Sequence, residues 1–242
     1  LGDIYVFDPE SSAWLELRLP SGERPIERAF HAAACYVDEL YVFGGWTFRP
    51  CGGLVPCPVL LNDLRQLRLR PTPMWTTLVV DGVPPTPRQG HTMSVVGGSF
   101  VVFGGLGFAY NATTGVSQGV YLNDVCVFTL ASRTWSPLRL AGSPPTPRTG
   151  HSATLAPSTD ILIFFGGMNE EGALADMHAL DVARGIWFQV YATGSYPSPR
   201  QFHVAARFAD EILIFGGAPL PPARGTDSPF IFSFVYTELR TN

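Results

Sequence analysis

The sequence predicts an all-β fold built from repeats of four short strands, and three observations support this. Residues 148–190 contain four short apolar runs rich in β-branched and aromatic residues, separated by turn signals: RTGHSATL, DILIFFGG, LADMHALD and IWFQV. A set of Arg, His and Gly-Gly positions recurs four times in the same order. The composition, with 25 Gly, 22 Pro and only 15% charged residues, suits a turn-rich domain with a sizeable core.

Each repeat begins with an Arg, followed three residues later by a His and then by a Gly pair. From the Arg to the first Gly is 16 residues in three repeats (28 to 44, 88 to 104, 200 to 216) and 18 in the other (148 to 166). An Asp and a Trp follow in most repeats. The repeated positions are Arg28, Arg88, Arg148 and Arg200; His31, His91, His151 and His203; Gly44, Gly45, Gly104, Gly105, Gly166, Gly167, Gly216 and Gly217; Asp3, Asp63, Asp124 and Asp176; and Trp14, Trp75, Trp135 and Trp187.

These residues closely resemble the Kelch family, whose mark is a Gly pair closing the second strand and a Trp in the fourth. Successive Arg residues are 60, 60 and 52 apart (28, 88, 148, 200), close to the roughly 50 residues of a kelch repeat. The resemblance covers essentially the whole chain. It implies a kelch-type β-propeller, in which four-stranded antiparallel blades surround a central channel.

Taken in order, the chain reads as a single propeller segment. Residues 1–19 match the second half of a blade, residues 28–80, 88–140 and 148–190 match complete blades, and residues 200–239 match an incomplete blade. Closure as four blades would make residues 4–7 and 230–239 compete for the same third-strand place. We therefore expect a segment of a longer propeller, of six or seven blades as the resemblance suggests, with fused domains outside it.

Residues that recur in every blade are expected to have a structural duty in every blade. The Gly pairs allow close approach of another chain at a strand end, and the Trp residues pack one blade on the next. The His residues are expected to make hydrogen bonds between blades rather than bind a metal. Glu171, Asp176 and His178 are the nearest approach to a metal-ligand set, but no Cys or second His accompanies them, so no metal and no cofactor is predicted.

The four repeated arginines leave two interpretations open. Each begins an innermost strand, so together they would surround one mouth of the channel. Each guanidinium could bond carbonyls or a carboxylate of its own surroundings. Alternatively, the ring of forked donors could receive acidic side chains of a peptide partner.

Residues that differ between blades are more promising for function. The segments after the Gly pairs (46–60, 106–120, 168–173 and 218–228) should lie on the same face as the Pro-rich segments before each Arg, VDGVPPTPR, LAGSPPTPR and ATGSYPSPR. The two long insertions read as loops of about fifteen residues, which are commonly binding elements. The candidate partner-binding residues in them are Trp46, Phe48, Arg49, Phe108 and Tyr110.

Two features of these insertions bear on the compartment. A disulfide between Cys51 and Cys57 is sterically possible, and Asn111-Ala112-Thr113 is a glycosylation sequon; both would favour a secreted or lumenal location. No signal peptide is visible, so free thiols in the cytoplasm are the default expectation. Cys35 and Cys126, in strand segments, read as buried thiols.

Composition excludes some classes of function. A net charge of -4 gives no basic field for nucleic acid, and no apolar run is long enough to span a membrane. The chain is therefore predicted to be a scaffold that binds a protein or peptide through the insertion face. The alternative is part of a kelch-type enzyme, such as a metal-dependent oxidase, a sugar epimerase or a specifier-like protein, with catalytic residues outside this segment; none is recognisable within it.

Overall fold

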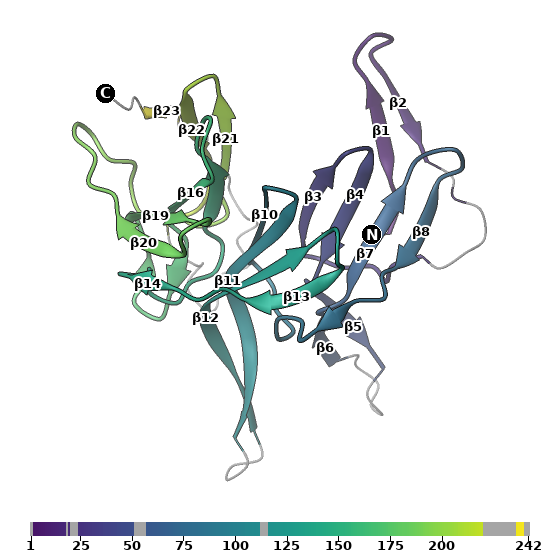
Figure 1. The fold of residues 1–242 in the computed structure, drawn as a ribbon, viewed down its shortest axis with the longest axis horizontal. Coiled ribbons are helices and arrows are strands. Elements are labelled where there is room, and N and C mark those ends of the chain that lie inside the picture. The colour runs from purple at the N-terminus through teal and green to yellow at the C-terminus, as the bar shows by residue number, and fades with distance from the viewer. Residues whose placement is uncertain are drawn as a thin grey trace, which may run out of the picture.

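The computed structural model describes residues 2–17, 19, 24–50, 57–111, 116–219 and 236–239. Every regular element in these ranges is a β-strand, and nearly all strand pairs are antiparallel. The strands form small sheets that stand side by side as successive blades (Figure 1). This confirms the all-β propeller architecture predicted from the repeats.

We number the blades 1 to 5 in chain order. Blade 1 consists of β1 (Tyr5–Asp8) and β2 (Ala13–Glu16), and blade 5 of β21 (Val204–Phe208), β22 (Glu211–Phe215) and β23 (Tyr236–Leu239). Blades 2 to 4 each have four antiparallel strands in sequence order. Their strands are β3 (Ala32–Tyr36), β4 (Glu39–Phe43), β7 (Leu64–Arg68) and β8 (Met74–Thr77); β10 (Thr92–Val96), β11 (Ser99–Asn111), β12 (Val116–Thr129) and β13 (Thr134–Pro137); and β15 (Ser152–Leu155), β16 (Ile161–Phe165), β19 (Met177–Asp181) and β20 (Ile186–Gln189).

The first strands of blades 2 to 5 lie next to one another. Strand β10 contacts both β3 and β15, and β15 contacts β21, so these four strands line the inner side of the arc. The chain leaves and re-enters each blade at two opposite ends. The Gly pairs and the repeated arginines lie at one end, which we call the insertion face, and the β3–β4 and β10–β11 turns lie at the other.

Two blades carry a fifth, parallel strand that the sequence did not predict. The segment between blades 2 and 3 forms β9 (Asp81–Gly82) beside β13, and the segment between blades 3 and 4 forms β14 (Ala141–Gly142) beside β20. Gly is required there because a Cβ at Gly82 would lie 2.1 Å from the carbonyl oxygen of Trp135. Each linker therefore covers the outer edge of the next blade.

The first three insertions contain strands, which corrects the prediction that they are loops; most of the fourth, 218–228, lies outside the described residues. After the first Gly pair, β5 (Trp46–Arg49) and β6 (Cys57–Leu60) form a hairpin. In blade 3 the second and third strands simply continue past a bulge at Phe103 and Gly105 to make one long hairpin. Blade 4 has a small one, β17 (Met168–Asn169) with β18 (Gly172–Ala173). The β5–β6 and β11–β12 hairpins project from the same side of the molecule (Figure 1). The strands extend into the insertions because the two arms of each hairpin hydrogen-bond to each other. Their alternating apolar side chains then pair across the hairpin.

The core lies between blades rather than within one blade. The ring of Trp135 in blade 3 lies 5.2 Å from that of Phe43 in blade 2, and Trp187 in blade 4 lies 5.2 Å from Phe103 in blade 3. These aromatic rings, together with the aliphatic side chains around them, hold neighbouring sheets together. Trp14, in blade 1, is instead exposed.

The two strand cysteines are less buried than predicted. Cys35 is exposed and Cys126 is half-buried, and both are free. Cys35 pairs with Leu40 across β3 and β4, but it lies near the turn end of the strand and stays exposed. Burial raises the pKa of the Cys126 thiol to about 11, with a further contribution from the neighbouring Asp124 carboxylate.

Candidate functional site

The insertion face is assembled by backbone pairing between the start of each first strand and the residue after each Gly pair. Isolated bridges join Ala29 to Trp46, Gln89 to Leu106, Thr149 to Met168 and Gln201 to Ala218. The Pro-rich segments are tied in as well, since Asn62 donates to the carbonyl of Pro85 in the next linker. The insertions thus begin beside the inner strands, on a rigid base.

Each repeated arginine is bonded within its own blade. Arg88 donates Nε to the carbonyl of Thr86, Nη1 to the carbonyl of Gly104 and to Asp124, and Nη2 to Asp124 and the hydroxyl of Thr86. All five N–H groups are used, and the side chain is fully buried. Arg148 repeats this pattern with Thr146, Gly166 and Asp176.

These contacts favour one of the two interpretations of the arginine ring. Arg88 and Arg148 have no free donor for an acidic partner, because their guanidinium groups already hold a carboxylate bidentately. Arg28 pairs likewise with Asp63 at 2.8 and 2.9 Å, and Arg200 bonds the carbonyl groups of Ser198 and Gly216. Arg28, Arg88 and Arg148 thus hold their own blades together, and a partner-binding role of the ring stays a prediction. Sequence reasoning allowed for a carboxylate partner but did not assign Asp63, Asp124 and Asp176, although they recur in step with the arginines.

The carboxylates bound by the arginines have lowered pKa values. Burial alone would raise the pKa of Asp63, Asp124 and Asp176, but hydrogen bonds and the positive charge from the arginines lower each pKa below the usual range. The effect is strongest at Asp176, which also bonds His178 at 3.0 Å. Among the described residues no three His, Cys, Asp or Glu side chains converge as a metal site. Of the three residues considered as metal ligands from the sequence, Asp176 and His178 are hydrogen-bonded to each other.

The repeated histidines lie between blades. His151 Nε2 lies 3.1 Å from the hydroxyl of Thr92 in the preceding blade, and His203 Nε2 lies 2.8 Å from that of Ser152. His91 makes no such bond, and both its ring nitrogens are buried without a partner of normal geometry among the described residues. The reason is that Ala32 occupies the position held by Thr92 and Ser152 in the next two blades.

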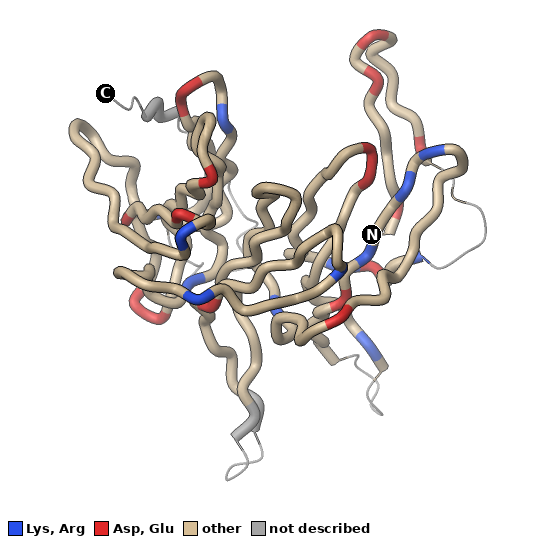
Figure 2. The backbone as a smooth tube through the Cα atoms, viewed as in Figure 1, with Lys and Arg blue, Asp and Glu red and all other residues tan. Residues whose placement is uncertain are grey.

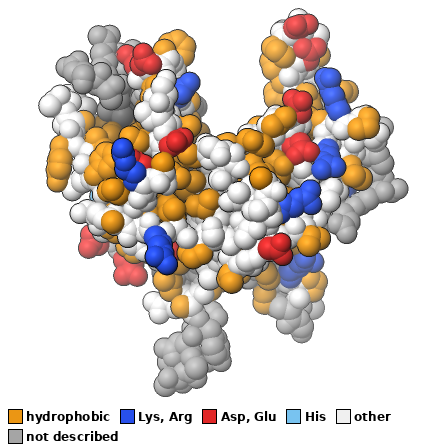
Figure 3. Space-filling model, viewed as in Figure 1, with side chains coloured by type: hydrophobic (Ala, Val, Ile, Leu, Met, Phe, Trp, Pro, Cys, Tyr) orange, Lys and Arg blue, Asp and Glu red, His pale blue; other side chains and the backbone are white. Residues whose placement is uncertain are grey.

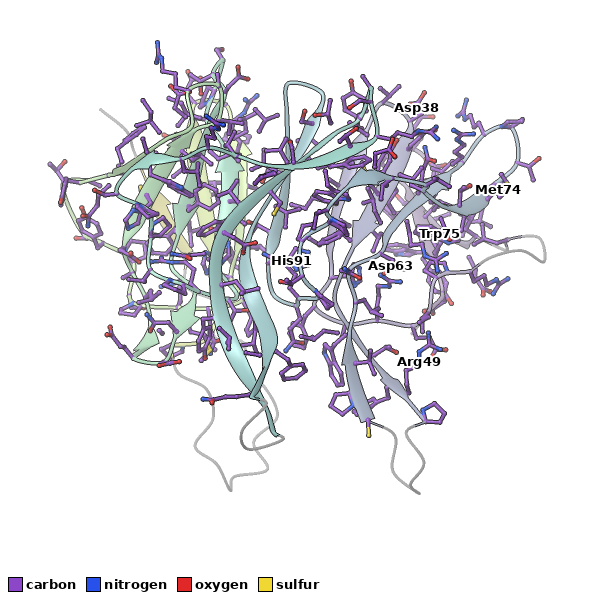
Figure 4. All side chains as sticks on the ribbon, turned by 60° about the horizontal axis from the view of Figure 1, so that its bottom comes forward. Asp38, Arg49, Asp63, Met74, Trp75 and His91 are labelled. Atoms are coloured by element: carbon purple, nitrogen blue, oxygen red, sulfur yellow. The ribbon has the colours of Figure 1, made fainter. Side chains whose placement is uncertain are left out.

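Burial keeps these imidazoles neutral. Desolvation, and then the charge of the neighbouring arginine, lower the pKa of His91 to about 3 and that of His203 to about 4, and the pKa of His151 falls well below its usual value. Each ring also meets a Phe of the preceding blade edge-on, as His91 does with Phe43 at 5.3 Å. Figure 4 shows His91 in the interior between blades. A Cβ at Gly44 would lie 2.8 Å from this imidazole, so the first Gly of the pair makes room for it.

The predicted partner-binding aromatics lie on the projecting hairpins. Phe48 on β5 is 56% exposed and Phe108 on β11 is 53% exposed. Trp46 is half-buried with its ring 4.7 Å from that of Phe48, so Phe48 is the exposed member of this aromatic pair. Arg49 is exposed at the far end of β5, opposite to Asp38 at the other end of blade 2 (Figure 4). The Tyr110 side chain lies outside the described part of the chain.

A second aromatic pair, which sequence reasoning missed, lies where the innermost strands begin. The rings of Phe30 in blade 2 and Phe202 in blade 5 are 5.1 Å apart although two complete blades separate them along the chain. They are linked through the backbone: Gly90 N–H donates to the Phe30 carbonyl, Gly150 N–H to that of Gly90, and Phe202 N–H to that of Gly150. This hydrogen-bonded row, which we call the inner ring, places both phenylalanines at the insertion-face mouth of the channel.

The inner ring requires a left-handed backbone at every position. Its φ values are 54° at Phe30, 63° at Gly90, 64° at Gly150 and 53° at Phe202. Glycine adopts this conformation freely, whereas a bulky residue with a Cβ is strained in it by about 1–2 kcal/mol. A comparison of the position two residues after each repeated Arg could have found this pair, because two blades have Gly there and two have Phe.

Other predictions about the insertions lie partly outside the described residues. Cys57 is disulfide-bonded, while Cys51 is not described, so the Cys51–Cys57 pairing stays a prediction. The side chain of Asn111 and residues 112–113 are not described either. In the described ranges, no helix with the length and hydrophobicity of a membrane span is found.

Comparison with known proteins agrees with the blade geometry. The family model described as the KLHDC2/KLHL20/DRC7 Kelch-repeats domain matches residues 1–217. The chain belongs to the Kelch-repeat family. This Kelch chain is 28% identical over 234 residues to Kelch domain-containing protein 1 of Mus musculus, covering 89% of the chain and 55% of the relative.

Other relatives carry the kelch repeats within much longer proteins. Acyl-CoA-binding domain-containing protein 5 of Arabidopsis thaliana is 29% identical over 90% of this chain, which spans 32% of that protein. Host cell factor 1 of Rattus norvegicus is 28% identical over 89% of the chain, which spans 11% of it. Among solved structures, that of YjhT superposes with a TM-score of 0.67 at 18% identity, covering 89% of this chain and 66% of that one. This last likeness shows the fold alone.

Proposed function

We propose that this kelch segment is a binding module that recognises a protein or peptide through its insertion face. The observation that carries the proposal is the Phe30–Phe202 pair. Both side chains are partly exposed, at 44% and 37%, and both hold a backbone conformation that Gly90 and Gly150 adopt without strain. Since strained backbone conformations cluster at functional sites, the pair is assigned to partner contact.

The surrounding surface suits an apolar anchor of a partner. Phe48 and Phe108 are exposed on hairpins that project from the same face, and Trp46 pairs through its backbone with Ala29, the residue before Phe30. Aromatic side chains presented on a rigid base are typical of interface hot spots. Charged residues are scattered singly along the described chain and form no continuous basic tract (Figure 2). Recognition is therefore assigned mainly to apolar contact.

We also propose that the segment itself is not catalytic. Its buried imidazoles are neutral and sit between blades, and its repeated carboxylates are committed to arginines. These groups support the fold rather than proton transfer to a substrate. An enzymatic role of a longer protein would then depend on residues elsewhere.

Peptide display on the immobilised chain tests the binding proposal. Peptides selected on the native protein should lose at least tenfold in affinity for the F48A/F108A double variant. The matched control is F208A, which removes an equally exposed phenylalanine (67%) at the opposite end of blade 5. Selected peptides that bind all three proteins equally, or the absence of any enriched peptide, would refute the placement.

The predicted cytoplasmic location and the disulfide at Cys57 point to different compartments, because disulfides form in oxidising ones; the cysteines provide the test. Cys35 and Cys126 are free, whereas Cys57 is disulfide-bonded in the structure. Alkylation of the native protein, recovered from its source cells, should label all four thiols if the compartment is reducing. Labelling of only two thiols, with the rest appearing after reduction, would instead place the protein in an oxidising compartment.

A further inference from the structure

A cleft of about 770 Å³ opens between blades 2 and 3 at the end opposite the insertion face. Its walls are the turns of both blades, residues 37–39 and 68–70 on one side and 97–98, 129–131 and 133 on the other. Its floor contains Tyr41, Gln66, Leu78 and Phe128. Asp38, labelled in Figure 4, marks this end of blade 2.

The floor of the cleft departs from the internal repeat. Tyr41 on β4 is paired in register with Gln66 on β7, and both are buried. The same register pair is Val101 with Val127 in blade 3 and Ile163 with Ala179 in blade 4. Folding of a blade therefore needs only apolar residues here. Blade 2 alone among these three blades places a hydroxyl and an amide at this position.

These polar groups form one connected network. The Tyr41 hydroxyl donates to Glu39 Oε2 at 2.6 Å, and Gln66 Nε2 donates to the same carboxylate and to the Tyr41 oxygen. Arg68 donates Nε to Glu39 Oε1 at 2.8 Å. Although burial would raise the pKa of Glu39, these hydrogen bonds lower it. Burial, and next Glu39, raise the pKa of Tyr41 to about 12. The network thus keeps Glu39 ionised and holds the Arg68 guanidinium at the wall.

The charge that remains at the mouth of the cleft is mainly positive. Glu39 is already matched by Arg68, which leaves Arg70 and Arg133 against Asp38. Neither Arg70 nor Arg133 has a side-chain hydrogen bond or ion pair with another described residue. One comes from blade 2 and the other from blade 3, so they face the cleft from both walls.

We propose that this cleft binds a short peptide segment that carries an acidic side chain next to an aliphatic one. The carboxylate would accept hydrogen bonds from Arg70 and Arg133, because guanidinium groups bind carboxylates in a forked geometry. The aliphatic side chain would lie on the partly exposed Leu78 and Leu130, below the mouth. A peptide fits better than a small organic acid because the two arginines stand on opposite walls of an open groove that also presents the aliphatic side chains of Leu78 and Leu130.

The site is independent of the insertion face, and its test uses the full chain with defined probes. The acidic peptide Ac-Glu-Leu-Glu-Leu-NH₂ is compared with its neutral form, Ac-Gln-Leu-Gln-Leu-NH₂, and with sodium glutarate, in competition against a fluorescein-labelled acidic peptide. The acidic peptide should compete at least tenfold better than either other probe. The R70Q/R133Q double variant should lose at least tenfold in affinity, and 0.5 M salt should weaken binding to the native chain.

Matched variants separate this site from others. R184Q removes an exposed arginine of blade 4, and F48A/F108A alters the insertion face; both should leave affinity for the acidic peptide unchanged. Y41F, which removes only the hydroxyl of the network, should reduce it a few-fold without unfolding the chain. The proposal fails if the neutral peptide competes equally well, if glutarate matches the acidic peptide, or if R70Q/R133Q binds as the native protein does.

Discussion

Arg148 holds Asp176 through two parallel hydrogen bonds of 2.7 Å, which join the segment leading into the first strand of blade 4 to the residue before its third strand. The arginine is fully buried, whereas 29% of the Asp176 side chain is exposed. The pair thus fixes the insertion-face end of the blade, where the Gly pair turns away from the sheet.

Removing this carboxylate should destabilise the fold. We expect D176A to lower the free energy of unfolding by about 3 kcal/mol, because a buried guanidinium is left unpaired. D124A should cost less, about 1–2 kcal/mol, since 47% of its side chain is exposed and water can partly replace it. Urea unfolding measures both. D210A, at an exposed turn of blade 5, is the control and should change stability little; equal effects of all three would contradict this role.

The unpartnered His91 predicts a stabilising substitution. A32S should place a hydroxyl where Thr92 and Ser152 bond the next histidine, and should raise the free energy of unfolding by about 1 kcal/mol. S152A should lower it by a similar amount, because His203 loses its partner. Thermal unfolding of the two variants checks the pair. If A32S destabilises the chain while S152A has no effect, the hydrogen bond has been misassigned.

The buried histidines predict loss of stability in mild acid. In the unfolded chain a histidine binds a proton near pH 6.5, whereas the folded pKa values are about 3 for His91 and about 4 for His203. The unfolded state therefore binds more protons between these limits, so stability falls as the pH decreases from about 6.5. Each histidine contributes at most about 1.4 kcal/mol per pH unit.

Urea unfolding at pH 7.5, 6.5, 5.5 and 4.5 measures this slope. The carboxylates paired with arginine have lowered pKa values, so their contribution is lost only below about pH 4. H203Q should make the slope between pH 6.5 and 4.5 shallower. Stability that stays constant across this range would show that the imidazoles are not kept neutral.

Replacing either phenylalanine of the inner ring by glycine should weaken binding but leave stability nearly unchanged. F30G and F202G should leave the free energy of unfolding within about 1 kcal/mol of the native value, because relief of the left-handed strain offsets the lost ring contact. Affinity for peptides selected on the native chain should fall at least tenfold. Calorimetry and fluorescence polarisation provide the two measurements.

Glycine positions of the inner ring supply the opposite control. A Cβ at Gly90 would lie 2.2 Å from the hydroxyl oxygen of Thr149, so G90A should destabilise the fold by more than 1 kcal/mol. If F30G proved as destabilising as G90A, the phenylalanine would be a structural residue and not a binding one.

The sequence predicted the blades well because their signals are local and repeated. The Gly pairs, the Trp positions and the strand alternation each recur within about 60 residues, so they reinforce one another. It could not place contacts that depend on tertiary packing. Arg88 and Asp124 are 36 residues apart, and their pairing depends on how the first and third strands start at the same end of the sheet. The Phe30–Phe202 contact depends on the arc of four blades.

The insertion hairpins and the polar cleft show a different limit. Periodic apolar residues near Phe108 were expected in a loop because their length exceeded an ordinary turn, yet the strands simply continue. The repeat gives no signal for Tyr41 and Gln66, because the matching positions of the next two blades are apolar. Apolar side chains also reach the surface over the middle of the molecule, between scattered arginines and acidic groups (Figure 3). The alternation of inward and outward residues along a strand does not predict these exposed apolar side chains.

The parallel segments β9 and β14 mean that the cooperative folding unit is shifted from the sequence repeat. A truncated chain beginning at Arg88 would contain every antiparallel strand of blade 3, yet it would leave the outer strand β13 with an unpaired edge, because its covering residues Asp81 and Gly82 come from the previous linker. Such edges promote association between molecules. Excised or permuted forms of this protein should therefore start at or before Val80, so that they keep the linker strand that covers the edge of the next blade.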